Sequence, residues 1–242
     1  MVIVVVDKFW LTGLLLLFAT EAQAVVVAAD YQAFWLWSGV RPQAVLGRAK
    51  TLYILQGQVS ASRRYPEGLR LIAQGISIPH LKHREIWLVY RVHTLHWTPE
   101  VYRALFAQLI RWRRAGNAVV GVQIDLDART RHLHRYVAFL SDLRERLSAD
   151  YKLSVTGLLD WSSHADPRTI NRLKGVVDEV VVQTYQGRHS IPDHAAYLPS
   201  LSRLNLPFKI GVIQHGEWRE PDYLRDSPWF RGYVVFLRNT GH

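Results

Sequence analysis

Eight short apolar segments, rich in Val, Ile, Tyr and Trp, recur along this chain, each bounded by Gly, Pro, Asp or basic residues. Segments of this kind are typical of buried parallel strands. Several of them are separated by longer amphipathic patterns with the helical period. The expected strands are residues 31–37, 51–59, 85–93, 118–126, 152–159, 179–185, 208–214 and 233–237.

Three helices are predicted between these strands. The first begins at residues 98–100, where Thr, Pro and Glu supply an N-cap, a first-turn proline and a first-turn acid, and it ends at Gly116. The second spans residues 133–147, where apolar side chains recur every three or four positions, and the third begins at Asp166. The segments after the first and seventh strands are weaker as helices.

Strands that alternate with helices predict a compact (β/α)8 TIM barrel of the α/β class. The alternative is a doubly wound open parallel sheet, which would normally show a glycine-rich phosphate turn after an early strand. Residues 35–39 read WLWSG and lack that turn. No linker divides residues 25–242, so we expect a single domain there. The chain has no cysteine, which excludes disulfides, thiolate metal sites and cysteine nucleophiles.

The amino-terminal 24 residues have the pattern of a signal peptide. An apolar run at residues 9–19 follows Lys8 and precedes an Ala-Gln-Ala sequence that ends at Ala24. The run is shorter than the about 20 apolar residues that a membrane span needs. We expect cleavage after Ala24, with Ala29 as the second candidate, and a periplasmic or secreted domain without a transmembrane span. An uncleaved amino-terminal anchor is the alternative.

The fourth expected strand carries the strongest chemical signal. Along residues 120–127, Gln123, Asp125 and Asp127 share one face, and the intervening Val, Ile and Leu share the other. The apolar face suits the helix layer, so the carboxylates would face the barrel axis, where burial separates their pKa values. One protonated and one ionised acid are what glycosidic bond cleavage requires. A structural hydrogen-bond network or a helix cap is the alternative.

Polar and aromatic side chains also end several other strands. They are Trp37, Arg91, Asp160, Trp161, Gln183, Tyr185, Gln214, Glu217 and Trp218. Strand carboxyl ends meet at one rim of a barrel, so these residues predict a sugar-binding cleft. Each has a structural alternative: Trp37 could pack in the core, Asp160 could cap a turn, and Glu217 could be a solvated loop acid. The histidines lack metal-binding spacing, so we expect no metal and no cofactor.

Two resemblances support this interpretation. Residues 121–127 (GVQIDLD) resemble the strand-4 signature of glycoside hydrolase family 18, Asp-Gly-x-Asp-x-Asp-x-Glu, and residues 182–185 (VQTY) are similar to its strand-6 Met-x-Tyr-Asp. Anchored on Gly121, the alignment places Asp127 on the catalytic glutamate; anchored on the two aspartates instead, it places Arg129 there. Gln186 replaces the strand-6 aspartate, and residues 236–237 lack the strand-8 tryptophan.

Residues 30–240 as a whole resemble an uncharacterised bacterial group, domain-of-unknown-function family 3142. The resemblance rests on residues 122–127, 156–161 (TGLLDW) and 177–185 (VDEVVVQTY). It implies a glycosidase-like barrel without an established substrate.

These observations predict an exported protein of glycoside hydrolase type that acts on an envelope or extracellular polysaccharide. Asp127 would be the general acid, and Asp125 would tune it or polarise an acetamido group. Asp160 would be a reserve base or nucleophile. Gln183 and Tyr185 would orient the sugar, and Trp161 and Trp218 would stack on its rings.

Two other hypotheses stay open. One is a non-catalytic glycan-binding barrel. The other follows from the net charge of +10 and is a basic envelope protein that binds anionic lipid or nucleic acid. The leading hypothesis needs no nucleic-acid partner, and its polysaccharide could be acidic.

Overall fold

The computed structural model describes residues 24–61, 68–82, 84–127, 132–159, 161, 166–192, 194–199, 201 and 205–239. The apolar run of the expected signal peptide and the candidate acid Asp160 lie outside the described residues.

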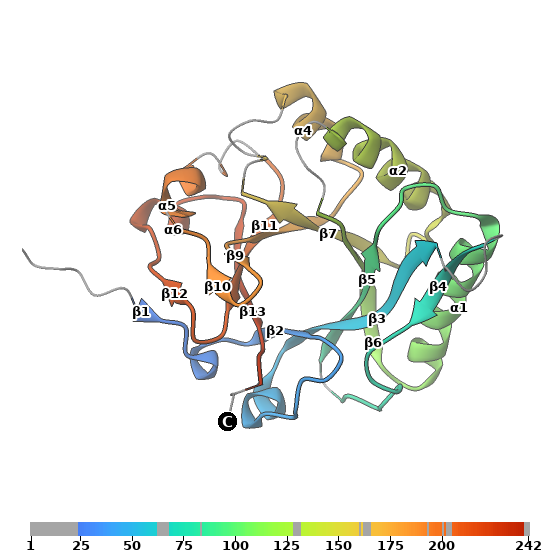
Figure 1. The fold of residues 1–242 in the computed structure, drawn as a ribbon, viewed down its shortest axis with the longest axis horizontal. Coiled ribbons are helices and arrows are strands. Elements are labelled where there is room, and N and C mark those ends of the chain that lie inside the picture. The colour runs from blue at the N-terminus through green and yellow to red at the C-terminus, as the bar shows by residue number, and fades with distance from the viewer. Residues whose placement is uncertain are drawn as a thin grey trace, which may run out of the picture.

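Eight parallel strands close into a barrel, which confirms the expected fold and excludes the open sheet (Figure 1). Each strand is hydrogen-bonded to the next, and the ring is closed because β2 pairs with both β13 and β3. All eight coincide with strands expected from the sequence. In barrel order they are β2 (Ala33–Leu36), β3 (Thr51–Ala61), β5 (Glu85–Val92), β6 (Ala118–Asp125), β7 (Lys152–Leu158), β8 (Glu179–Gln183), β11 (Phe208–Ile213) and β13 (Phe230–Phe236).

The three expected helices are present and lie outside the ring of strands (Figure 1). They are α1 (Pro99–Arg114), α2 (Leu133–Arg146) and α4 (Pro167–Leu173). Asp166 caps α4 because its carboxylate accepts the Arg168 amide hydrogen at 3.2 Å. Three other connections hold only short helical turns: a 3₁₀ helix at Ala44–Arg48, α5 (His194–Tyr197) and α6 (Asp222–Arg225).

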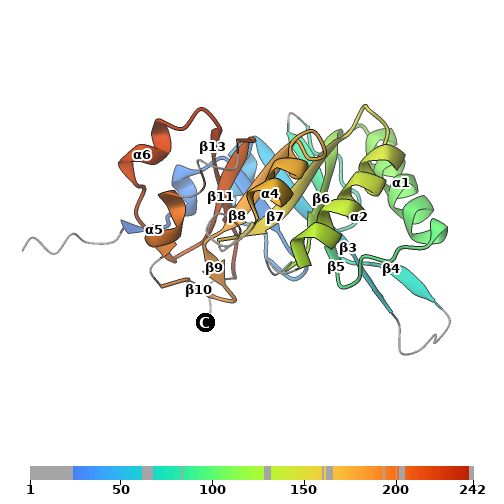
Figure 2. The ribbon, with the colours of Figure 1, turned by 90° about the horizontal axis from the view of Figure 1, so that it is seen from above.

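In the connection between β3 and β5, the described residues form a strand, β4 (Leu69–Ala73), and no helix. β4 pairs antiparallel with the second half of β3, and this hairpin projects beyond the barrel (Figure 2). Two further strand pairs decorate the loops. β1 (Ala24–Val25) pairs with β12 (Glu217–Trp218), and β9 (Tyr185–Gln186) pairs with β10 (His189–Ser190).

Side chains that point into the barrel fill it, so its centre is a core. Trp35, Tyr53 and Trp87 are buried there together, and the rings of Tyr53 and Trp87 stack at 5.8 Å. Alternate residues of the same strands, such as Ile124 of β6, pack against the helices in a second cluster. This division follows from the two-residue period of a strand.

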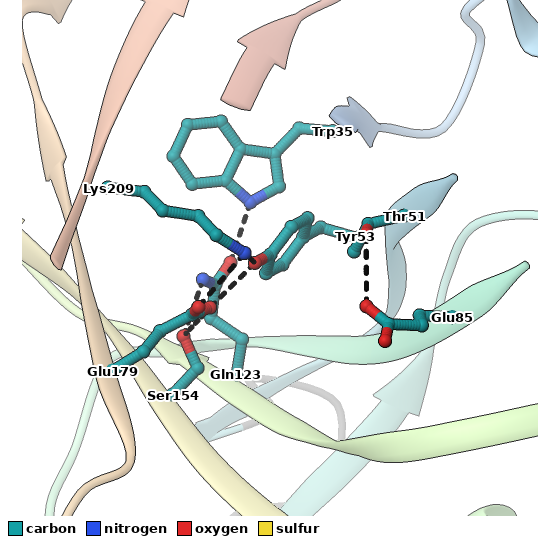
Figure 3. A network of polar contacts seen from close by, with 8 residues as sticks. All are labelled: Trp35, Thr51, Tyr53, Glu85, Gln123, Ser154, Glu179 and Lys209. Carbon is teal, nitrogen blue, oxygen red and sulfur yellow. Dashed lines mark hydrogen bonds and ion pairs between the residues drawn. The ribbon is translucent and has the colours of Figure 1, made fainter. Parts of the chain in front are cut away.

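A buried ion pair lies near the amino-terminal ends of the strands (Figure 3). Glu179 is the first residue of β8, and its carboxylate forms an ion pair with Lys209 Nζ at 3.0 Å. Its other oxygen accepts hydrogen bonds from the Tyr53 hydroxyl at 2.6 Å and the Ser154 hydroxyl at 3.0 Å. Lys209 also donates to the Tyr53 oxygen at 2.8 Å. The charges are therefore paired and solvated by protein groups, as burial requires.

Gln123 extends this network toward the middle of the barrel. Its amide nitrogen donates to Ser154 Oγ at 3.0 Å, and its oxygen accepts from Trp35 Nε1 at 2.6 Å (Figure 3). Gln123 has no exposed surface. The hydrogen bonds thus join six barrel strands across the interior.

Candidate functional site

A pocket of about 710 Å³ opens at the carboxyl ends of the barrel strands, where barrel proteins carry their chemistry. Its walls combine aromatic rings with a few polar groups, the composition expected of a small-molecule site. The lining residues are Trp37, Arg91, Asp127, Leu158, Leu159, Gln183, Tyr185, Gln186, Gly187, Ile191, Pro192, Tyr197 and Phe236.

The two aspartates at the carboxyl end of β6 have contrasting surroundings. Asp125 is 3% exposed, whereas Asp127 is exposed and lines the pocket. Asp125 Oδ2 accepts a hydrogen bond from Arg91 Nε at 3.1 Å, and Oδ1 accepts one from Thr156 Oγ1 at 3.0 Å. The strand alternation seen in the sequence therefore places Asp125 inside the barrel, and Asp127 beyond it at the rim.

Burial raises the pKa of the Asp125 carboxyl above its ordinary value. The positive charge of Arg91 and the hydrogen bond from Thr156 act in the opposite direction, and the charge of Asp127 adds to the increase. Asp125 therefore holds its proton more tightly in the folded protein than in the unfolded chain.

Arg91, on β5, is held on two sides. Its Nε binds Asp125, and its guanidinium carbon lies 4.4 Å from the ring centroid of Trp37. A second cavity of about 270 Å³ adjoins this arginine and is lined by Arg91, Val92, His93, Asp125, Leu126 and Asp127. Arg91 and Asp127 line both cavities, so they occupy the boundary between them.

Three aromatic side chains form one wall of the larger pocket. The ring of Tyr185 lies 5.5 Å from that of Phe236, and the ring of Trp37 lies 5.7 Å from Phe236 on the other side. Burial, followed by the negative charge of Asp125, raises the pKa of the Tyr185 hydroxyl well above its ordinary value. Tyr185 is therefore a neutral hydrogen-bond donor at physiological pH.

Several residues expected from the sequence do not line this pocket. Gln123 lies below it, in the interior network. Gln214 is buried, forms reciprocal amide hydrogen bonds with Gln43, and accepts the Arg238 amide hydrogen at 2.9 Å. In both side chains the amide oxygen and nitrogen already hydrogen-bond to other protein groups, so neither amide is available to a sugar hydroxyl.

The same holds for three residues beyond β7 and β11. Trp161 is 2% exposed and packs edge-on against Tyr136 in the helix-layer core. Trp218 is 5% exposed and stacks on His194 at 5.2 Å, and its neighbour Glu217 pairs with β1. These positions do not fit the stacking and sugar-binding roles expected for them.

Sequence reasoning missed Thr156, Tyr197 and Phe236. Thr156 could have been found, because Ser154 and Thr156 are the polar members of an alternating strand and therefore face inward with Asp125. Phe236 carried no such signal, because an aromatic residue near a strand end is equally typical of a core. Tyr197 carried none either, because it lies in the four-residue helix α5, which is too short to show a periodic pattern.

Within the described ranges, no group of three His, Asp or Glu side chains is arranged to hold a metal ion. In those same ranges, no helix is both long and apolar enough to cross a bilayer.

Asp125→Asn tests the raised pKa. Because the folded protein binds this proton more tightly, the stability that Asp125 contributes is present below its unfolded pKa and is lost as pH rises through its folded pKa. Asparagine does not titrate, and its amide can still bind both Arg91 and Thr156. We expect the variant to gain in melting temperature over wild type at pH 7, with a smaller gain at pH 4.

Asp142→Asn is a control, because the pKa of Asp142 is shifted in the opposite direction to that of Asp125. Hydrogen bonds from Arg146 and Tyr102 lower the pKa of the Asp142 carboxyl, so its stabilisation is present above the unfolded pKa and is lost as pH falls. This variant should melt below wild type at pH 7 and approach it at pH 4. A constant difference for Asp125→Asn at both pH values would contradict the raised pKa.

Residues 93–198 match the family model described as Domain of unknown function (DUF3142). The match contains β6, β7 and β8, with Asp125, Asp127, Gln183 and Tyr185, and it confirms the resemblance inferred from the sequence. It is narrower than the expected 30–240 and does not reach Trp37 or Arg91. A search of curated proteins finds no match.

Two solved structures share the fold. One is the xylanase and α-amylase inhibitor protein XAIP-II from Scadoxus multiflorus, with a TM-score of 0.51 and 14% identity over 85% of this chain and 92% of that chain. The other is the Bacillus cereus spore cortex-lytic enzyme SleL, with a TM-score of 0.50 and 15% identity over 75% of this chain and 49% of that chain. At such identities the likeness shows the TIM-barrel fold alone.

Proposed function

We propose that this protein hydrolyses a glycan that contains 2-acetamido sugars, with Asp127 as the general acid. The observation that carries the proposal is the placement of Asp127, exposed in the pocket at the carboxyl end of β6, beside the buried Asp125. A general acid must reach the glycosidic oxygen, and among the described residues that line the larger pocket Asp127 is the single carboxylate.

A single acid favours a substrate-assisted route over the usual pair of carboxylates. Protonated Asp127 would donate its proton to the glycosidic oxygen as the bond from the anomeric carbon breaks. The acetamido carbonyl oxygen of the same sugar would bond to that carbon and form an oxazolinium. Water would then attack the anomeric carbon as the bond from that carbon to the acetamido oxygen breaks, which restores the acetamido group. The Asp127 carboxylate would take a proton from the attacking water, which regenerates the acid.

The surrounding residues would orient the sugar. Tyr185 and Gln183 line the pocket and can donate hydrogen bonds to the acetamido or hydroxyl oxygens. The aromatic wall would pack against a sugar ring. Asp125 is too buried to contact much of the substrate, so its role would be to hold Arg91 in place.

A non-catalytic glycan-binding barrel is the second candidate. The presence of one carboxylate among the described residues of the larger pocket also supports it, because most glycoside hydrolases need two. A further solved structure with a TM-score of 0.50 and 13% identity is the inhibitor protein XAIP-I in complex with trehalose. A protein that has this fold and is named as an inhibitor can therefore bind a sugar.

The proposal includes export and removal of residues 1–24. Val26 is 2% exposed, and its amide donates to the Gly216 carbonyl at 2.8 Å. Cleavage after Ala29 would remove Val26 and all of β1, so the fold favours cleavage after Ala24. Mass spectrometry of the amino terminus of the exported protein would decide between the two sites.

The proposed function is tested by incubating the protein with oligosaccharides that contain 2-acetamido sugars. Binding is measured by calorimetry, and new reducing ends are measured in the same samples. Binding with product release supports the hydrolase. Binding without product supports the glycan-binding barrel, and the absence of both with every glycan contradicts a glycan-related role.

A further inference from the structure

We propose that the glycan is acidic and that Arg91 binds one of its carboxylates at the boundary between the two cavities. This inference rests on the proposed function, because it names the class of glycan that the same site accepts.

The guanidinium of Arg91 is held in a fixed orientation, but only one of its three nitrogens donates a hydrogen bond to a described residue. Asp125 holds Nε at 3.1 Å and Trp37 covers one face at 4.4 Å, so the orientation of the planar group is determined from two directions. Neither terminal nitrogen hydrogen-bonds to any residue in the ranges that the structure describes. The side chain is 42% exposed and lines both cavities.

The free edge of this guanidinium suits a carboxylate. With Nε occupied, the two terminal nitrogens still present parallel N–H donors, a geometry that matches the two oxygens of a carboxylate. The hydroxyl oxygens of a neutral sugar can also accept hydrogen bonds from these donors, but they lack the negative charge that strengthens the hydrogen bonds of a carboxylate. A binding site already held rigid also loses little conformational entropy when the ligand arrives.

The charges near Arg91 leave its positive charge available. Asp125 is its ion-pair partner, but burial favours the neutral form of that carboxyl. Asp127 must carry a proton when it acts as the general acid, so it would not repel an anionic substrate in the reactive complex.

The experiment compares three hexasaccharides by calorimetry in 0.15 M salt. They are a hyaluronan hexasaccharide, which alternates 2-acetamido sugars with uronic acids, its methyl ester, and neutral N-acetylchitohexaose. Asp127→Asn is the background for all proteins, so that the oligosaccharides stay intact. We expect the hyaluronan hexasaccharide to bind about tenfold to a hundredfold more tightly than its methyl ester. This factor corresponds to the usual free energy of a hydrogen bond to a charged group.

Arg91→Gln should remove this preference, so that the acid binds no more tightly than its ester. Arg172→Gln is the matched control, because Arg172 is an exposed residue of α4 that does not line either cavity, and its loss lowers the net charge equally. It should retain the preference. Because Arg91→Gln leaves Asp125 without its cation, the double variant Arg91→Gln/Asp125→Asn, which removes both charges, should give the same result.

Equal affinities for the acid and its ester, or a preference that survives Arg91→Gln, would overturn the inference while the proposed function stands. An equal loss for Arg172→Gln would show that the preference comes from net charge alone, and would also overturn it. Failure of all three hexasaccharides to bind would overturn the proposed function together with the inference.

Discussion

Replacing Asp127 with asparagine should lower the rate of glycan hydrolysis by about 10²–10⁴-fold, the usual contribution of a general acid. Asparagine has nearly the same size but cannot give a proton to the leaving oxygen. Asp127 is exposed in the pocket and Asp125 is almost fully buried, so no other described residue of the larger pocket can take over its role. The measurement is the rate of reducing-end release at saturating substrate, with the dissociation constant determined separately.

Two further variants make this result interpretable. Asp127→Glu keeps a carboxylic acid on a longer side chain and should retain measurable hydrolysis. Asp226→Asn removes an exposed acid after α6, outside both cavities, and should hydrolyse at the wild-type rate. Hydrolysis that continues at the wild-type rate in Asp127→Asn would assign the acid to another residue.

Glu179→Ala should lower the free energy of unfolding by about 3–5 kcal/mol, because it leaves Lys209 as a buried charge without its partner. The hydroxyls of Tyr53 and Ser154 lose their acceptor at the same time. Such a loss is a large fraction of the about 5–15 kcal/mol that stabilises an ordinary domain. The measurement is equilibrium unfolding in urea at pH 7.

Figure 3 also shows the matched control. Glu85 begins the strand β5 as Glu179 begins β8, but it is exposed and accepts one hydrogen bond, from Thr51 at 3.1 Å. Glu85→Ala should cost less than about 1 kcal/mol. The double variant Glu179→Gln/Lys209→Met removes both buried charges and should be more stable than Glu179→Ala. Equal losses for Glu179→Ala and Glu85→Ala would show that burial of the ion pair does not matter.

The barrel strands and the longer helices could be predicted from the sequence because each has a strong local signal. Buried parallel strands are nearly continuous apolar runs, and α1 and α4 have a proline just inside their start. The β3–β4 hairpin was missed. The alternation at residues 69–72 is short, and β4 pairs with residues 57–61 of β3, beyond the segment of β3 that pairs with β2, a contact that no local pattern encodes.

The site was only partly predictable, for a geometric reason. Asp125 and Asp127 were found because strand alternation is regular inside β6. Trp161 lies three residues past the end of β7, and Trp218 lies five residues past the end of β11, where the alternation of those strands no longer fixes the direction of a side chain. The sequence therefore indicates which strand ends carry polar groups, but not which loop residues turn back over the pocket.

The interior network has a consequence for how such a barrel can change over evolution. Its ion pair lies near the amino-terminal ends of the strands, whereas most pocket residues lie at or beyond the carboxyl ends. Mutations that alter the loops after β6 or β8 therefore leave the Glu179–Lys209 pair in place. Descendants of this sequence can change what the pocket binds without having to rebuild the interactions that keep the chain folded.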